Sequence, residues 1–329
     1  MKHNVKITVI LISMFLITQL IGLFVVSVYT SPDKPLPFNM QPPEGVTPND
    51  AIPSIIIAFI FAICLFFILT RINAEKFIRT WFFIVTAIAI GLTLKAFFFF
   101  NFSDILFNNP IPIINYIIPE ISIFSIILFF VLALPLAYIK IFKRNILVHN
   151  FTELLIYPGI AAVFVSILDI FWTIVILLLI SLYDIWAVWR SEFMQKMAKY
   201  QIENLKFFTG FFIPYANTKE KIKIKYIKEK YKNKSEKFIE KKFKDAKIKV
   251  NLAILGGGDV IFPIITAGVV LRAWGLIPAL VIVLFGALAL LWLFVFAKKG
   301  KFYPAMPFLT AGLYLGLLVD YLLSLIHLI

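Results

Sequence analysis

Two aspartates lie inside apolar segments that are long enough to cross a bilayer. Asp259 follows three consecutive glycines within an apolar run from Val250 to Leu271, and Asp184 lies in the apolar run that precedes it along the chain. A carboxylate in hydrocarbon is costly, and an ionisable residue within a membrane segment is therefore a functional-site candidate. These two positions are the first candidates for chemistry in the chain.

The two carboxylates suit general acid and base catalysis. At about 1.5 Å per helical residue, both lie within roughly 9 to 14 Å of the same membrane boundary. Two carboxylates in one low-dielectric site do not both ionise easily, so one keeps a proton and the other acts as a base. Such a pair can activate water to attack a peptide bond without a covalent enzyme intermediate. We predict that Asp184 and Asp259 form one catalytic pair in a watered site.

Three further features are candidates for supporting this pair. Without side chains, Gly256 and Gly258 let the backbone approach a neighbouring helix or a substrate, although ordinary small-residue packing also explains them. Tyr183 could donate a hydrogen bond to the neighbouring carboxylate or line the site. The segment Pro304-Ala305-Met306-Pro307 interrupts helical structure where the last apolar run begins, although a proline early in a plain helix gives the same pattern.

The composition predicts the fold class. Of 329 residues, 61% are hydrophobic and 15% are charged, whereas about 25% are charged in a soluble domain. Apolar runs of about 20 residues recur along the chain, which is typical of membrane helices. We predict a single all-α polytopic membrane domain with nine transmembrane helices. The predicted spans are residues 7–29, 51–70, 80–100, 113–139, 152–168, 170–189, 250–271, 276–297 and 304–327.

A long basic loop, residues 190–249, separates the two predicted spans that carry the aspartates. The net charge is +14, and 18 of the 32 Lys and Arg residues lie in this loop. A loop that faces anionic lipid headgroups explains this charge better than nucleic-acid binding, which we do not predict. Within the loop, the apolar residues 207–214 suit an amphipathic segment at the headgroups, and the alternation from Lys221 to Tyr226 suits an exposed strand.

The basic residues of the shorter connections predict the orientation. Eleven lie on one side of the membrane and two, Lys34 and Arg272, on the other. Under the positive-inside rule, the N-terminus and the loop 190–249 are cytoplasmic and the C-terminus is outside. The eleven are Lys2, Lys6, Arg71, Lys76, Arg79, Lys140, Lys143, Arg144, Lys298, Lys299 and Lys301.

Other hydrolytic chemistries lack their motifs. The three histidines are scattered, and the chain contains neither a His-Glu-x-x-His zinc motif nor a Gly-x-Ser-Gly nucleophile motif. The single cysteine, Cys64, excludes an intrachain disulfide. We therefore predict a site with no metal and no cofactor, and no pattern in the sequence indicates an oligomeric state.

Taken together and in this order, Tyr183-Asp184, Gly256-x-Gly258-Asp259 and Pro304-Ala305-Met306-Pro307 resemble the presenilin and signal peptide peptidase superfamily of intramembrane aspartyl proteases. The chain departs from the family's Pro-Ala-Leu only by Met306, a substitution of similar volume. The predicted orientation is similar to that of presenilin and opposite to that of signal peptide peptidases.

The resemblance implies a presenilin-like fold in which Asp184 and Asp259 are catalytic and the segment 304–307 borders the site and helps to hold substrate. The expected substrates are transmembrane helices of other proteins, which must unwind near the pair before cleavage. Strand-like pairing with backbone near Pro304 or within Lys221 to Tyr226 is one way to hold them.

A transporter or channel coupled to protons or cations is the alternative. Such proteins also carry buried carboxylates, glycine breaks and prolines within membrane segments. Asp320, in the outer half of the last predicted span, is the residue that suits this function best.

Overall fold

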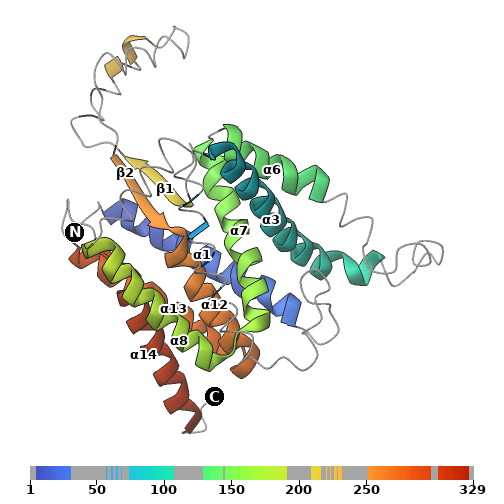
Figure 1. Cartoon of the computed structure of the whole chain (residues 1–329), viewed down its shortest axis with the longest axis vertical. Coiled ribbons are helices and arrows are strands. Elements are labelled where there is room, and N and C mark those ends of the chain that lie inside the picture. Colours follow the sequence, from blue (N-terminus) through green and yellow to red (C-terminus); the bar gives the residue numbers. More distant parts are fainter. Residues whose placement is uncertain are drawn as a thin grey trace.

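The computed structural model describes seven stretches of the chain, with isolated residues between positions 57 and 68 and between 220 and 231. The stretches form a helical bundle with a small sheet at one end (Figure 1). They are residues 5–30, 74–106, 129–143, 145–190, 209–215, 251–297 and 303–325.

Seven helices of the described residues are long and apolar enough to cross a membrane, which confirms the predicted multi-pass helical architecture. They correspond to seven of the predicted spans. The other two predicted spans, 51–70 and 113–139, lie mostly outside the described residues. The helices are α1 (Val5–Thr30), α3 (Glu75–Leu106), α7 (Ile146–Ile167), α8 (Ile170–Ile185), α12 (Gly257–Trp274), α13 (Leu276–Phe296) and α14 (Met306–Leu325).

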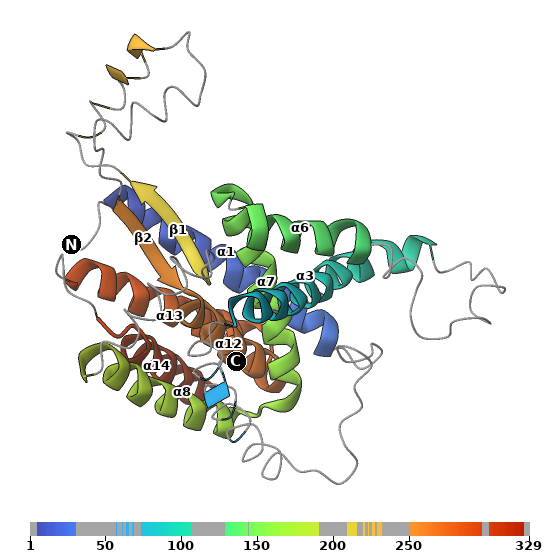
Figure 2. The ribbon, with the colours of Figure 1, turned by 45° about the horizontal axis from the view of Figure 1, so that its top comes forward.

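Helices α1, α7 and α12 pack against one another at the centre of the bundle (Figures 1 and 2). Helix α3 lies on the other side of α7, whereas α13 and α14 continue the bundle from α12. Helix α8 contacts both α14 and α12. The short helix α6 (Leu134–Tyr138) lies beside α3 between two π-helical turns, η2 (Phe129–Ala133) and η3 (Ile139–Lys143). A further π turn, η4 (Trp186–Arg190), extends α8.

Glycine allows close contact between helices. A Cβ added at Gly159 of α7 would lie 2.1 Å from the Ala89 carbonyl oxygen of α3, and one at Gly312 of α14 would lie 2.5 Å from the Ala289 Cβ of α13. Small residues at such crossings let membrane helices gain van der Waals contact without a hydrophobic driving force.

Polar groups complete the turn between α7 and α8. The Asp169 side chain caps α8 by accepting a hydrogen bond from the Trp172 N–H at 2.8 Å. At the end of α7, the Arg272 guanidinium donates to the carbonyl oxygens of Val165, at 2.5 Å, and Leu168. These contacts satisfy helix-end groups that lack intrahelical partners.

The sheet consists of β1 (Gly210–Tyr215) and β2 (Asn251–Gly256), which pair antiparallel from Gly210 opposite Gly256 to Tyr215 opposite Asn251. Residues 251–256 therefore form a strand, and the helix begins at Gly257 instead of near Val250. Pairing with β1 satisfies this backbone without a helix, and the glycines that follow have low helix propensity. The predicted amphipathic segment 207–214 largely coincides with β1.

The strand predicted from Lys221 to Tyr226 is wrong at its described residues, because Lys223 and Tyr226 are helical. The Lys223 ammonium donates to Glu220 at 3.1 Å, and Lys230 donates to the Tyr226 hydroxyl at 3.4 Å. These contacts join residues three and four positions apart, which are neighbours on a helix surface. The described residues of this stretch therefore make the side-chain contacts of a helix and not those of a strand.

Candidate active site

Asp184 lies in the last turn of α8, and its carboxylate contacts the beginning of α14. The Met306 N–H donates to Oδ2 of Asp184 at 3.0 Å, and the Ala305 backbone makes a second hydrogen bond to this carboxylate. The first N–H groups of a helix lack intrahelical acceptors and carry partial positive charge. The buried carboxylate thus supplies an acceptor that α14 needs, and the helix terminus stabilises negative charge on Asp184.

The proline segment forms the entry to α14. Residues 303–305 are not helical, Met306 is the first residue of α14, and Pro307 is the second. Pro307 has no N–H, at a position where an N–H would find no helical acceptor, and its fixed φ suits the first turn. The structure therefore brings Ala305 and Met306 to Asp184, while Pro304 is buried beside them.

A ladder of polar contacts joins α8 to α14 behind Asp184. The Ser181 hydroxyl donates to the Thr310 hydroxyl at 2.6 Å, and the Tyr314 hydroxyl donates to the Ile174 carbonyl at 2.5 Å. On α14, Met306, Thr310 and Tyr314 are each four positions apart, about one turn. Their partners on α8, Asp184, Ser181 and Ile174, are three and seven positions apart, about one and two turns, so the contacts fix the sliding position of α14 against α8. The sequence alone does not single out these residues; the signal for Ser181 and Thr310 is a spacing of three and four positions from Asp184 and Met306.

Asp259 lies in the first turn of α12, directly after β2. Gly256 ends the strand in an extended conformation, and a Cβ added there would lie 3.1 Å from Oδ2 of Asp259. The carboxylate is therefore near the end of the strand. From α1, the buried Gln19 donates to the Val260 carbonyl at 3.0 Å, which holds the same helical turn. The signal for Gln19 in the sequence is that a polar residue lies inside the predicted span 7–29.

The three glycines differ in their surroundings. A Cβ at Gly257 would lie 2.9 Å from the Tyr157 hydroxyl of α7, closer than Cβ atoms normally approach. At Gly258, the nearest atoms to an added Cβ belong to the Phe262 ring at 3.8 Å, and Gly258 itself is exposed. Close packing therefore occurs at Gly257, whereas Gly258 leaves space beside Asp259.

The two aspartates lie at helix ends on the same side of the bundle. Helices α8 and α12 contact each other, and the end of α8, the start of α12 and the start of α14 lie toward the same end of the bundle (Figure 1). Each carboxylate lies at a helix N-terminus, Asp259 at that of its own helix and Asp184 at that of α14. Tyr183 is 38% exposed and its ring packs against Trp186 with centroids 6.2 Å apart, so it lies on the outer face of α8.

Asp320 does not belong to this group. It lies fourteen positions after Met306 on α14, which corresponds to about 21 Å along the helix. Its side chain is buried, and neither carboxylate oxygen has a hydrogen-bond partner among the residues that the structure describes. Within those same residues, no group of His, Cys, Asp and Glu side chains could hold a metal ion.

The glycine series gives a direct test of this packing. We expect Gly257→Ala to lower the free energy of unfolding by about 1–3 kcal/mol, because the added methyl group overlaps Tyr157. Gly258→Ala should be neutral or stabilising by up to about 1 kcal/mol, since it adds helix propensity where there is room. Denaturant unfolding in detergent measures both, and Tyr157→Phe should restore part of the loss in Gly257→Ala. Equal destabilisation by the two alanines would contradict this packing.

Comparisons with known proteins show the family and the fold of the chain. The family model described as signal-peptide peptidase, presenilin aspartyl protease matches residues 12–326. A solved structure of a presenilin family intramembrane aspartate protease in space group C222 has a TM-score of 0.57 at 17% identity, covering 96% of this chain and 99% of that chain. One in space group P2 has a TM-score of 0.56 at 19% identity, covering 95% and 96%. No curated protein sequence matched significantly. Because the family match spans nearly all of the sequence, the chain belongs to the signal-peptide peptidase and presenilin family and is an intramembrane aspartyl protease.

Proposed function

We propose that the protein hydrolyses peptide bonds within transmembrane segments, with Asp184 and Asp259 as the catalytic pair acting on a bound water. The observation that carries this proposal is the Asp184 carboxylate held by the start of α14, on a helix that contacts α12. Asp259 lies in the first turn of α12, so each acid is next to the positive end of a helix dipole. This environment favours negative charge in surroundings that are otherwise apolar.

The reaction needs one proton and one negative charge shared between the two acids. The ionised carboxylate takes a proton from the water as the water oxygen attacks the carbonyl carbon. The protonated partner gives its proton to the carbonyl oxygen. Proton transfer to the amide nitrogen then breaks the C–N bond, releasing an amine and a carboxylic acid. The space beside Gly258 leaves room for a substrate backbone next to Asp259.

The edge of β2 supports a proposal for how substrate is held. The N–H and C=O groups of Gly210 and Phe212 point away from β2, because both bond to side chains of α7. In an antiparallel ladder, the residues opposite such positions also point outward. On β2 these are Ile254, opposite Phe212, and Gly256, opposite Gly210. Their backbone groups face the second edge of the sheet.

An unwound substrate segment can pair with this second edge of β2 by strand addition. Because the edge ends at Gly256, directly before the turn that carries Asp259, the paired segment would lead to the catalytic pair. This replaces the stretch from Lys221 to Tyr226 as the strand that receives substrate. Proteolysis is favoured over the alternative of transport, since the family is one of proteases.

We also infer that the N-terminus and the loop 190–249 are cytoplasmic and that the C-terminus is outside. Lys140, one of the basic residues that predict this orientation, is buried and ion-paired with Glu153, so it does not count as a free cation. The other cytoplasmic basic residues still outnumber the two on the opposite side. The test uses intact cells and a Cys64→Ser background. A thiol reagent that does not cross the membrane should label a cysteine added at the C-terminus of the protein but not one placed in the loop 190–249. Labelling of the loop cysteine alone would show the opposite orientation.

Removal of either acid should abolish proteolysis. We expect Asp184→Asn and Asp259→Asn each to lower cleavage of a helical membrane peptide by at least about 100-fold, because each supplies a proton-transfer group. Mass spectrometry of the products in detergent or liposomes measures cleavage, and thermal unfolding checks the fold. Asp320→Asn is the matched control and should cleave normally. Wild-type cleavage by either active-site variant would refute the pair, and loss of cleavage only in Asp320→Asn would favour a relay of acids.

Proline substitutions test the role of the β2 edge. Ile254→Pro removes an outward N–H, and we expect it to lower kcat/KM by about 3- to 10-fold, the value of one hydrogen bond, while the fold persists. Leu255→Pro removes an N–H that faces β1 and should lower stability as well. Kinetics and unfolding of the two variants separate the effects. Wild-type kinetics for Ile254→Pro would argue against strand addition at this edge.

A further inference from the structure

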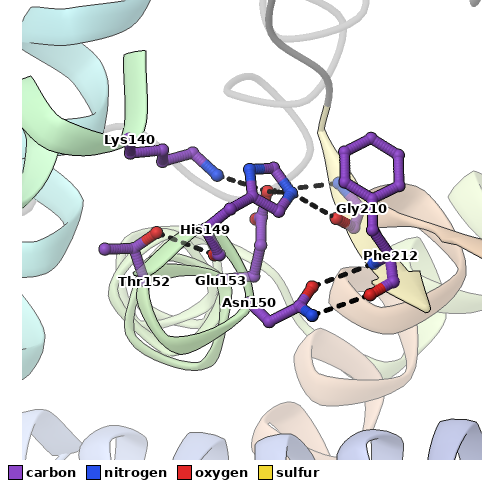
Figure 3. A network of polar contacts seen from close by, with 7 residues as sticks. All are labelled: Lys140, His149, Asn150, Thr152, Glu153, Gly210 and Phe212. Carbon is purple, nitrogen blue, oxygen red and sulfur yellow. Dashed lines mark hydrogen bonds and ion pairs between the residues drawn. The ribbon is translucent and has the colours of Figure 1, made fainter. Parts of the chain in front are cut away.

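Helix α7 presents a group of polar side chains to the outer edge of β1 (Figure 3). His149, Asn150 and Glu153 lie on the first two turns of the helix, and Lys140 approaches Glu153 from η3. The proteolytic mechanism does not use these four residues directly. We call them the α7 network.

Asn150 replaces a neighbouring strand for β1. Its Nδ2 donates to the Phe212 carbonyl at 2.7 Å, and its Oδ1 accepts from the Phe212 N–H at 2.9 Å. A carboxamide offers the same donor and acceptor as a peptide group, so one side chain satisfies both outward backbone groups of Phe212. At this position the outer edge of β1 is closed.

Glu153 and His149 satisfy the backbone of Gly210 in the same way. The Gly210 N–H donates to Oε1 of Glu153 at 3.2 Å. Its carbonyl lies 2.7 Å from Nε2 of His149, which must be the donor because a carbonyl oxygen only accepts. The third outward residue of β1 is Pro214, which has no N–H to satisfy. Both outward N–H groups on this edge, those of Gly210 and Phe212, therefore have an acceptor on α7.

A buried ion pair fixes Glu153. Its carboxylate contacts the Lys140 ammonium, and both side chains are almost fully buried. Burial lowers the pKa of Lys140, and the charge of Glu153 opposes that shift. Apolar residues of similar volume often stabilise a protein as well as a buried ion pair does, so stability alone does not account for these charges. The pair does fix the oxygen that receives the Gly210 N–H.

Aromatic contacts extend the docking along the strand. The His149 ring stacks on the Phe212 ring with centroids 4.8 Å apart, and the Tyr157 ring meets the Phe211 ring edge-on at 5.8 Å. The Tyr157 hydroxyl also lies next to Gly257, the first residue of α12. Helix α7 thus contacts both the strand that pairs with β2 and the helix that β2 enters.

We propose that the α7 network positions Asp259, by locking β1 to α7 so that the register of β1 with β2 sets where α12 begins. It also closes the outer edge of β1, so that β2 alone is open to a substrate strand. Lys140, His149, Asn150 and Glu153 are positioning residues in this proposal, which rests on Asp259 being one of the catalytic pair. Their effect is on kcat and on the choice of scissile bond.

The ion pair offers a sharp test in the full-length protein. Lys140→Met leaves a buried carboxylate without its partner, and we expect kcat per folded molecule to fall by about 10-fold or more through misplacement of Asp259. The double variant Lys140→Met with Glu153→Gln keeps an acceptor for Gly210 without the unpaired charge, and its kcat should return to within about 3-fold of wild type. Folded protein is quantified by gel filtration in detergent, and product ends are identified by mass spectrometry of a cleaved membrane peptide.

Two further variants keep the test decisive. Asn150→Leu removes both bonds to Phe212 and should lower kcat and scatter the product ends. Thr152→Val is the control, because the Thr152 hydroxyl bonds within its own helix to the His149 carbonyl at 2.8 Å, and its kcat and product ends should be those of wild type.

The outcomes separate this inference from the proposed catalytic pair. If Lys140→Met and Asn150→Leu keep wild-type kcat per folded molecule and wild-type product ends, the network is merely structural and the inference is overturned. If Lys140→Met does not fold, Asn150→Leu decides by the same two readouts. Cleavage by Asp259→Asn would instead remove the catalytic assignment, whatever the network variants do.

Discussion

Backbone N–H and C=O groups that leave the helical pattern inside a membrane bundle need partners, and this requirement organises the molecule. An unsatisfied peptide group in hydrocarbon costs several kcal/mol by common estimates. Such interruptions among the described residues include the turn between α7 and α8, the entry to α14 and the pair of strands. Arg272, Asp184 and the α7 network respectively supply partners at these places. At these three places, charged and amide side chains inside the bundle are located where backbone would otherwise be unpaired, whereas the buried Asp320 of α14 has no such role.

This requirement also explains how an acid is tolerated at the proposed active site. The Asp184 carboxylate accepts the N–H that begins α14, and the ladder through Ser181 and Thr310 holds the two helices at that position. Asp259 lies at the start of its own helix, where negative charge is favoured. The same helix ends that need acceptors thus stabilise the carboxylates. At one end of the bundle, the same carboxylates satisfy the helix ends and form the proposed catalytic pair. The proposed chemistry therefore depends on where α14 and α12 begin.

The helices and the two candidate aspartates could be predicted from the sequence, because the length of an apolar run and an isolated carboxylate within it are local signals. Seven described helices match predicted spans, and 170–189 agrees with the observed span. The strands are different, since an apolar run such as 250–256 reads as the start of a span until its partner is known. That partner, β1, lies within the long basic loop 190–249, far from β2 along the chain. The roles of Asn150 and Glu153 depend on β1, so no local pattern could assign them, although Asn150 is a polar residue beside the predicted span 152–168 and Glu153 is one inside it.

A two-stranded sheet has two edges, and in this protein the outward backbone groups of the two edges have different partners. At β1 the outward groups of Gly210 and Phe212 are bound by side chains, and the outward position of Pro214 has no donor. A third strand there would have to displace short hydrogen bonds and a buried ion pair. At β2, the proposed strand addition would pair the outward groups of Ile254 and Gly256, and a hydrogen bond is stronger in a low-dielectric site than in water. A stable transmembrane helix offers no free backbone to this edge, whereas an unwound segment does. Under the proposed strand addition, selectivity for unwound segments follows from hydrogen-bond supply and requires no recognition of particular side chains.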